Sequence, residues 1–343
     1  MGNQIQKWAD VAMFKADPIR TGKPEVHLLS CNSDPLGTIA SAALMYEGKS
    51  VTSLGDINDE QRRYYLEQVQ LNILEAPLEF VNFHFIISGV TRGFTHQMVR
   101  QRTATYAQES TRFAVKEDVP VGLPPSLVGT VPWTDWLNKC GAELYPLGPK
   151  PESRLVANAD VLNYAQKTAS KEQLWRRDWD EAVVDIGATY NALVNAGMPA
   201  EDARGLLPTN LLTRINYNTS LRGLKEHAGL RLCTQAQYEW RLVWVEMLGA
   251  IREYGSDQIY LKSDETGGQT VESSQWQFDA IADIFKPICY ARGKCMFMAD
   301  LDRFCSIRSR VNQHTELGTP SAKWDDISSA EWMLDTEAAR VSE

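Results

Sequence analysis

Two arginine-rich blocks constrain this chain more than any other feature of its sequence. The first block reads Gln97-Met-Val-Arg100-Gln101-Arg102 and is followed, after seven residues, by Ser110-Thr111-Arg112. On a helix, Gln97, Arg100 and Gln101 would share one face, because residues three and four apart are neighbours there. Arginine donors suit the oxygens of a phosphate and the edge of a base. From these residues alone, the block is either a local anion site or a solvated, charged helix end.

The composition is that of a folded protein with one large or two ordinary domains in 343 residues. Hydrophobic residues make up 43% and charged residues 23%, unlike a disordered chain. The net charge of −9 argues against nucleic acid or an anionic membrane surface as the main partner. No run approaches the roughly 18 apolar residues of a membrane span, and the first residues lack the apolar core of a signal peptide. We therefore expect a cytoplasmic protein with reduced cysteines.

The pattern of candidate helices and strands predicts an α+β fold. Aromatic and β-branched residues at 80–87 indicate a strand, and Ser33-Asp34-Pro35 is typical of a helix start. We expect helices at 35–46, 56–74, 93–102, 157–196 (as a hairpin), 199–208, 219–228, 234–254 and 275–290, with a further strand at 209–217. Residues 116–151 are expected to form loop with short strands, and residues 255–275 a flexible segment.

The second arginine-rich block, taken together with the first, resembles the sequence pattern of a known family. Residues 203–239 read ARGLLPTNLLTRINYNTSLRGLKEHAGLRLCTQAQYE. They resemble, without a gap, the pattern AR-x-x-LP-x-N-x-x-T…N-x-R-S-L…LR-x-x-x-x-AQ-x-E of the flavin-dependent thymidylate synthases. The first block, RQRTATYAQESTRF at 100–113, is similar to that family's signature Arg-His-Arg, seven residues, then Ser. The resemblance covers about 30–115 and 200–255.

The resemblance implies both a fold and a reaction. The fold is a mixed sheet flanked by helices: an N-terminal arm at 1–30, a catalytic domain at 31–255 with a helical insertion at about 116–198, and a C-terminal extension at 256–343. The reaction is reductive methylation of dUMP to dTMP by a methyltransferase of nucleotide biosynthesis. FAD is the cofactor, and methylenetetrahydrofolate and NADPH are co-substrates. The family also implies a homotetramer with active sites shared between protomers.

The family's nucleotide-binding residues fall on both blocks. The resemblance assigns dUMP to Gln97, Arg100, Glu109, Ser110, Thr111, Arg112, Arg204 and Arg231, with Arg204 supplied by a neighbouring subunit. Arg231 matches the catalytic arginine that polarises the uracil, since a permanent cation stabilises negative charge developing on the ring. Ser110 lacks a histidine base nearby in the sequence, so a positional role is favoured over a nucleophilic one.

The flavin-binding residues depart from the family pattern. The resemblance assigns FAD to Arg100, Gln101, Arg102, Gln108, Ser220, Arg222, Glu226, Leu230 and Gln235. Gln101 and Gln235 stand where the family has histidine, Gln108 where it has Glu, and Ser220 where it has Asn. An amide still forms hydrogen bonds but does not titrate as histidine does. A flavin- and folate-dependent hydroxymethylase and a catalytically silent nucleotide-binding homologue therefore remain open alternatives.

Three thiols and one imidazole lie in the C-terminal extension. Zinc accepts such a set of ligands, but the spacing of Cys289, Cys295, Cys305 and His314 matches no metal motif. We therefore expect no metal and interpret this segment as an added peripheral layer. His84 and His96 are as well explained by packing or solvent exposure as by ligand contacts.

Overall fold

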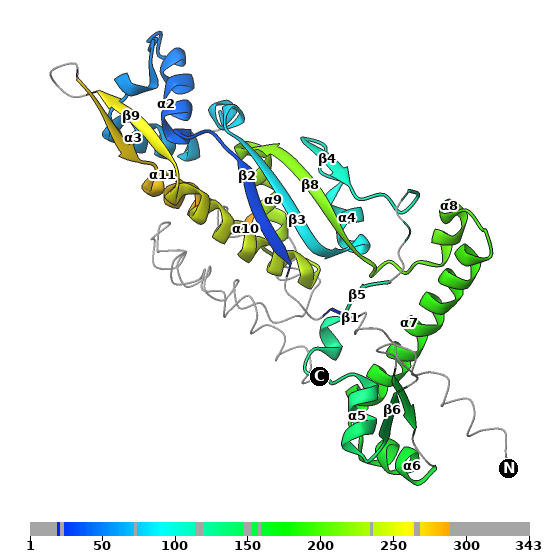
Figure 1. Ribbon diagram of the computed structural model, residues 1–343. Helices are drawn as coiled ribbons and strands as arrows, with labels where there is room; N and C mark the ends of the chain where they lie inside the picture. The colour runs from blue at the N-terminus through cyan, green and yellow to red at the C-terminus, as the bar shows by residue number, and fades with distance from the viewer. Residues whose placement is uncertain are drawn as a thin grey trace, which may run out of the picture. The chain divides into compact units, whose positions relative to one another are not determined.

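A four-stranded sheet forms the centre of the larger unit in this computed structural model (Figure 1). Its order is β2 (Glu25–Ser30), β3 (Asn82–Thr91), β8 (Leu212–Ser220) and β4 (Ala104–Gln108). The pairs β2–β3 and β4–β8 are antiparallel. Edge strand β2 comes from the last residues of the expected N-terminal arm.

The structure describes residues 19–20, 24–71, 74–113, 115, 119–146, 153–156, 159–233, 236–263 and 268–288. They divide into two compact units. The sheet unit holds the described residues of Lys23–Val90, of Phe94–Gln108 and from Arg214 onward. The insertion unit holds those up to Gly22, Thr91–Gly93 and those of Glu109–Thr213.

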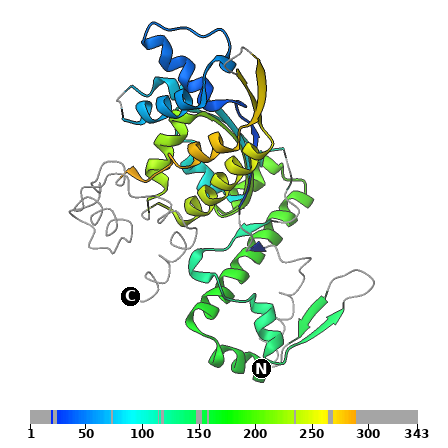
Figure 2. The ribbon, with the colours of Figure 1, turned by 90° about the vertical axis from the view of Figure 1, so that its left-hand side faces the viewer.

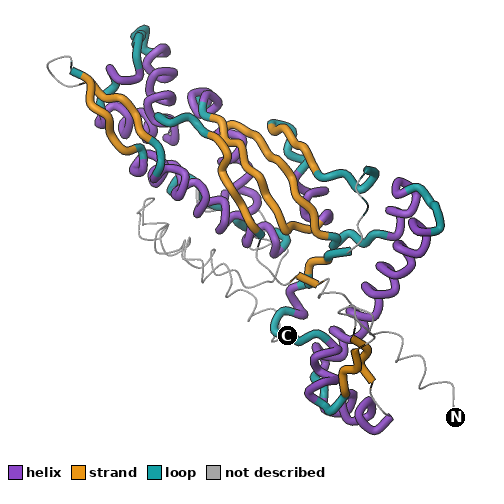
Figure 3. Tube along the Cα trace, in the orientation of Figure 1, coloured by secondary structure: helices purple, strands orange, loops and turns teal. Residues whose placement is uncertain are grey.

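The burial of side chains alternates along strand β3. Phe83, Phe85 and Ile87 are fully buried, and the residues between them are more exposed. This alternation is what a sheet with one covered face requires. Figure 3 shows β3 between β2 and β8, with the sheet drawn in orange. The strand expected at 80–87 is confirmed, although it begins at Asn82 and continues to Thr91.

Two helices cover the buried face of the sheet. They are α9 (Leu221–Arg231) and α10 (Tyr238–Ser256), and they share one apolar core with β3 and β8. Helix α11 (Gln275–Ala282) packs along α10, as Figure 2 shows. The short helix α4 (Arg92–Met98) follows β3 directly. Among the described residues, no helix is both long and apolar enough to cross a membrane.

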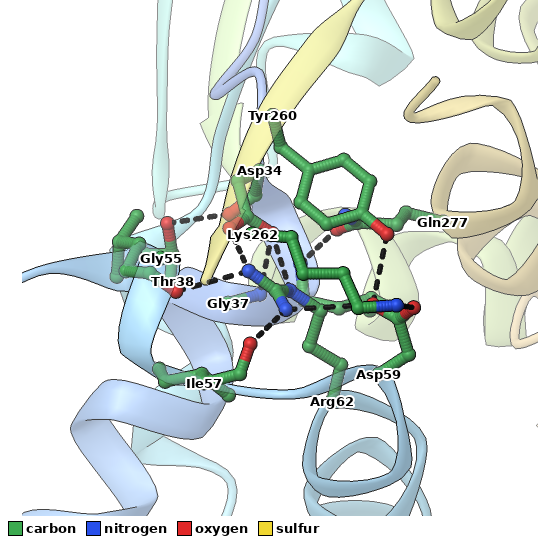
Figure 4. Close-up of polar contacts among 12 residues, drawn as sticks. Asp34, Gly37, Thr38, Gly55, Ile57, Asp59, Arg62, Tyr260, Lys262 and Gln277 are labelled. Carbon is green, nitrogen blue, oxygen red and sulfur yellow. Dashed lines mark hydrogen bonds and ion pairs between the residues drawn. The ribbon is translucent and has the colours of Figure 1, made fainter. Parts of the chain in front are cut away.

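The remaining helices of the sheet unit meet at a buried arginine. Helix α2 (Pro35–Tyr46) begins after Asp34, whose carboxylate accepts a hydrogen bond from the Gly37 N–H at 2.9 Å. The same carboxylate receives Nε and Nη2 of Arg62, at 3.0 and 2.7 Å, from helix α3 (Asp59–Leu71). The Arg62 guanidinium also donates to the carbonyl oxygens of Leu54 and Ile57, as Figure 4 shows in part. The Arg62 cation on α3 therefore holds the start of α2 through Asp34.

A hairpin from the C-terminal extension also contacts Arg62 and its neighbour Asp59. Strands β9 (Ile259–Ser263) and β10 (Gln269–Ser273) pair antiparallel. The Tyr260 hydroxyl donates to Asp59 at 2.8 Å, the Lys262 ammonium reaches the same carboxylate at 2.5 Å, and the Tyr260 ring lies 4.5 Å from the Arg62 guanidinium carbon (Figure 4). The expectation of a flexible segment at 255–275 is therefore wrong for its described residues.

Three other expected boundaries are corrected by the structure. Helix α4 ends at Met98 instead of 102. Helix α10 begins at Tyr238, after Gln237, so the expected capping start at 234 is wrong. Helix α11 ends at Ala282, well short of residue 290. Short 3-10 turns at Leu54–Asp56, Ala76–Phe80, Pro125–Leu127 and Arg204–Leu206 link several elements.

The insertion unit is built on the long helix α7 (Lys171–Asn195). Helix α6 (Ala159–Thr168) precedes it, so the helical segment expected at 157–196 is divided into two helices. Both pack on α5 (Trp133–Lys139), which lies where only loop and short strands were expected. Asp180 joins α5 to α7, because its carboxylate accepts from the Trp133 N–H at 2.8 Å and from Arg176 Nε at 2.6 Å. The smaller elements are α8 (Ala200–Ala203), the parallel pair β1 (Ile19–Arg20) and β5 (Val121–Gly122), and the antiparallel pair β6 (Glu143–Pro146) and β7 (Ser153–Val156).

Replacing Arg62 should destabilise the sheet unit strongly. Arg62→Met would leave the Asp34 carboxylate buried without its cation, and breaking a buried pair in this way costs about 3–5 kcal/mol. Chemical denaturation followed by circular dichroism measures this loss.

The neighbouring Arg63 provides the matched control. Its side chain is exposed and lies 4.1 Å from the Trp276 ring centre, so Arg63→Met should cost about 1 kcal/mol or less. Equal losses for the two variants would contradict the role assigned to Arg62.

Candidate functional site

The first arginine-rich block does not continue as a helix to its last residue. Helix α4 ends at Met98, and the Tyr106 hydroxyl lies 2.7 Å from the Met98 carbonyl oxygen and 3.2 Å from that of Gln101. The expectation that Gln97, Arg100 and Gln101 share one helix face is therefore wrong. Arg100 and Arg102 are exposed, and their side chains make no hydrogen bond or ion pair in the described part of the chain. Their guanidinium groups are left for a ligand or solvent.

Gln97 and Arg231 lie together, one from each block. Arg231 is the last residue of α9, and its Nη1 is 3.4 Å from Gln97 Oε1. Its guanidinium carbon lies 5.0 Å from the ring centre of Trp240. Within the described residues Arg231 has no carboxylate partner, and its Nε is buried without a hydrogen bond. Burial lowers the pKa of Arg231, although an arginine remains charged near neutral pH.

Gln101 is engaged by the protein itself. Its Nε2 donates to the Gly223 carbonyl oxygen at 2.9 Å, and its Oε1 accepts from the Tyr217 hydroxyl at 2.7 Å. Burial raises the pKa of Tyr217, which keeps the phenol protonated as a donor. The side chain therefore links the segment after α4 to β8 and α9. One amide hydrogen remains available for any other contact.

The other expected flavin-binding residues fall into two groups. Gln108 donates to the Thr95 hydroxyl at 2.8 Å, and Ser220 caps α9 by accepting from the Gly223 N–H at 3.2 Å, so both have local structural partners. Arg222, Glu226 and Leu230 lie on the solvent-exposed side of α9. Gln235 lies outside the described residues.

The exposed group has the chemistry that a dinucleotide needs. Arg222 is paired with Glu79 at 2.6 Å and with Glu226 at 3.3 Å, and Leu230 is 52% exposed. Arginine donors bind a pyrophosphate well, and an exposed leucine offers apolar contact to a ring. The residues present therefore fit FAD. Glu79, a partner in this arrangement, gave no signal in the sequence.

The remaining residues that were expected to bind the nucleotide lie in the insertion unit. Arg112 pairs with Glu201 through Nε at 2.7 Å and Nη2 at 3.0 Å, while Arg204 donates to the Glu201 carbonyl oxygen at 3.0 Å. Arg92 donates to the Glu109 carbonyl oxygen at 3.3 Å, and its pKa is lowered by burial and by the charge of Arg204. These three arginines form a basic cluster with the carboxylates of Glu201 and Glu109 beside them. Sequence reasoning missed Arg92 and Glu201.

Ser110 and Thr111 shape the loop that carries Arg112. The Ser110 hydroxyl accepts from the Arg112 N–H at 3.1 Å, and Thr111 is buried. This local turn fits the positional role expected for Ser110.

The candidate metal ligands of the C-terminal extension and the buried His227 lie in different parts of the chain. Cys289, Cys295, Cys305 and His314 lie outside the described residues. Where the chain is described, no three His, Cys, Asp or Glu side chains are grouped as metal ligands. His227 is buried and packs edge-on to Trp240 at 4.7 Å, and burial, with the charge of Arg231, lowers its pKa to about 3. It therefore stays neutral near pH 7.

The chain is similar to proteins of known family. Residues 27–254 match the model described as thymidylate synthase complementing protein. The flavin-dependent thymidylate synthase of Pyrococcus abyssi is 27% identical over 280 residues, which cover 81% of this chain and 98% of the relative. That of Geobacter sulfurreducens is 29% identical over 230 residues, which cover 66% of this chain and 82% of the relative.

Among solved structures, the UMP/dUMP methylase PolB from Streptomyces cacaoi, bound with 5-Br dUMP, aligns with 17% identity and a TM-score of 0.48. The alignment covers 68% of this chain and 92% of that one. Because the family model matches more than half of the sequence, from the first strand of the sheet to the end of α10, the chain belongs to the thymidylate synthase complementing protein family.

Proposed function

We propose that the protein is a flavin-dependent thymidylate synthase that converts dUMP to dTMP. The observation that carries this proposal is the Arg231 guanidinium, half-buried on an aromatic ring, with no carboxylate partner among the described residues. Such a cation is suited to a ligand on which negative charge develops. Methylenetetrahydrofolate and NADPH are the proposed co-substrates, and FAD, bound at the exposed residues of α9, supplies the reducing hydride.

The residues of the sheet unit would act on the base electrostatically. Arg231 would lie against a carbonyl oxygen of the uracil and stabilise the anion formed when the ring loses its N3 proton. Because this cation is preorganised and partly removed from water, it stabilises the developing charge more than a solvated group would. Gln97, beside Arg231, would donate to a second acceptor of the nucleotide. No enzyme nucleophile takes part in this scheme.

The basic cluster of the insertion unit is suited to binding a phosphate group. Arg112 and Arg204 share Glu201, so a dianionic phosphate could draw either guanidinium away from that carboxylate. Arginine is well suited to this because its paired N–H groups match phosphate oxygens. We further propose a cytoplasmic homotetramer in which Arg204 serves the active site of a neighbouring subunit.

A hydroxymethylase remains the second candidate because of the Gln101 contacts. The amide at this position is held by Tyr217 and Gly223 and does not titrate near neutral pH. A changed flavin environment could leave the transferred one-carbon unit unreduced. A silent nucleotide-binding homologue would bind dUMP and form no product.

The product of a single reaction mixture distinguishes these functions. With FAD, NADPH, methylenetetrahydrofolate and dUMP, we expect dTMP, identified by mass spectrometry of the nucleotide. A product heavier by one oxygen would identify the hydroxymethylase. Binding of dUMP without any product would favour the silent homologue, and both results would contradict the synthase assignment.

Removing the Arg231 cation should abolish turnover without releasing the flavin. Losing one preorganised donor to a developing anion typically lowers kcat by about 10²–10³-fold, so Arg231→Ala should reach at least that loss while FAD content stays unchanged. Arg252→Ala is the control, because Arg252 is an exposed arginine of α10 that contacts Asp283. Normal turnover in Arg231→Ala would overturn the catalytic assignment.

A further inference from the structure

Trp240 occupies a fixed position in the core beside the proposed site. It is the third residue of α10 and is fully buried. Its ring packs against Phe94 at 4.1 Å between ring centres and against His227 at 4.7 Å, nearly perpendicular to the latter. A large aromatic side chain confined by two other rings has little freedom to change rotamer. Whatever Trp240 touches is held in place with it.

Trp240 touches both site residues of the sheet unit through different parts of its ring. Its Nε1 donates to Gln97 Oε1 at 3.1 Å. Its face carries the guanidinium of Arg231, 5.0 Å from the ring centre. Gln97 Oε1 also lies 3.4 Å from Arg231 Nη1, so the three side chains form one closed group.

The indole fixes which end of the Gln97 amide faces outward. Trp Nε1 is only a donor, and so is the guanidinium of an arginine. The amide atom that meets them must therefore be the oxygen, because a flipped amide would set N–H groups against each other. Gln97 Nε2 has no hydrogen-bond partner in the described part of the chain. It remains a donor for a ligand.

The same ring supports Arg231 without cancelling its charge. A carboxylate in that place would hold the guanidinium but neutralise it. An aromatic face attracts a cation through its quadrupole and carries no net charge. The neighbouring His227 is neutral near pH 7 and does not change this balance. Arg231 therefore keeps its positive charge for a bound anion.

We infer that Trp240 is a positioning residue of the nucleotide site: it sets the Gln97 amide as an outward donor and holds Arg231 as an uncompensated cation. The ligand that fits this pair brings hydrogen-bond acceptors and gains negative charge, as a uracil ring does. The inference rests on the proposed function, in which Gln97 and Arg231 bind the base of dUMP.

Trp244 offers a matched comparison one turn further along α10. It is also fully buried and packs against His227 and Phe285, at 6.3 and 5.5 Å between ring centres. Among the described residues its Nε1 has no hydrogen-bond partner, and no hydrogen bond or cation–π contact joins it to Gln97 or Arg231 there. Replacing either tryptophan by Phe removes a similar volume and an indole N–H from the same core.

The test compares dUMP binding by Trp240→Phe and Trp244→Phe in the full-length protein with bound FAD. Loss of one hydrogen bond corresponds to about 2- to 10-fold in a dissociation constant. We expect the Kd for dUMP to rise by about that factor, and kcat to fall, in Trp240→Phe only. Trp244→Phe should bind dUMP as the wild type does. Circular dichroism confirms that each variant is folded.

A double-mutant cycle separates positioning from a merely structural effect. In a Gln97→Ala background the indole N–H has no amide to orient, so adding Trp240→Phe should weaken dUMP binding less than it does in the wild type. Additive effects within about 1.5-fold would contradict the inference, since independent sites add.

A second variant tests the same arrangement should Trp240→Phe not fold. In Gln97→Glu the carboxylate can still accept from Trp240 and Arg231, but it offers no outward donor and neutralises the cation. Its Kd for dUMP should exceed that of Gln97→Ala, and a Kd equal to or below it would contradict the inference.

The outcomes distinguish this inference from the proposed function. A wild-type protein that binds no dUMP would overturn both. A wild-type protein that binds dUMP, together with equal affinities for Trp240→Phe and Trp244→Phe, would overturn the role of Trp240 alone.

Discussion

The side-chain amide of Gln101 is the contact on which the arrangement of the two arginine-rich blocks depends. It spans from the Tyr217 hydroxyl on β8 to the Gly223 carbonyl oxygen on α9. The buried Tyr217 hydroxyl would lose this acceptor if the amide were removed, and an unsatisfied buried group costs about 1–3 kcal/mol. Because Gln101 lies just after α4 and Arg231 ends α9, this link keeps Gln97 within reach of Arg231. The Gln101 amide therefore serves the packing of the two blocks.

The C-terminal extension is part of the fold that supports this site. The family model ends at residue 254, but hairpin β9–β10 lies beyond it and reaches back to Asp59 and Arg62. Arg62 in turn holds the start of α2 through Asp34. Helix α11, in the same extension, lies along α10, which carries Trp240 at its other end. The hairpin and α11, which lie beyond the residues that the family model matches, thus contact α3 and α10.

The sequence predicted the elements whose signals are local. The Asp34-Pro35 start of α2, the aromatic strand β3 and the long helix α7 all follow from neighbouring residues. Hairpin β9–β10 could not be predicted this way, because its polar residues find their partner at Asp59, about two hundred positions earlier. Helix α4 ends early because a side chain from β4, Tyr106, lies against its last carbonyl groups. For the site, the resemblance singled out Gln97 and Arg231. The contacts of Gln101 with Tyr217 and of Trp240 with Gln97 could not be predicted, because they join residues more than a hundred positions apart.

The central claim is that flavin and nucleotide share one site built from both blocks. A visible absorption spectrum of the purified protein with FAD, recorded before and after dUMP is added, tests this claim most directly. We expect the flavin bands to be present and to shift when dUMP binds, because the nucleotide would lie against the flavin. A protein that takes up no flavin from an excess of FAD, or a flavin spectrum unchanged by saturating dUMP, would contradict the account.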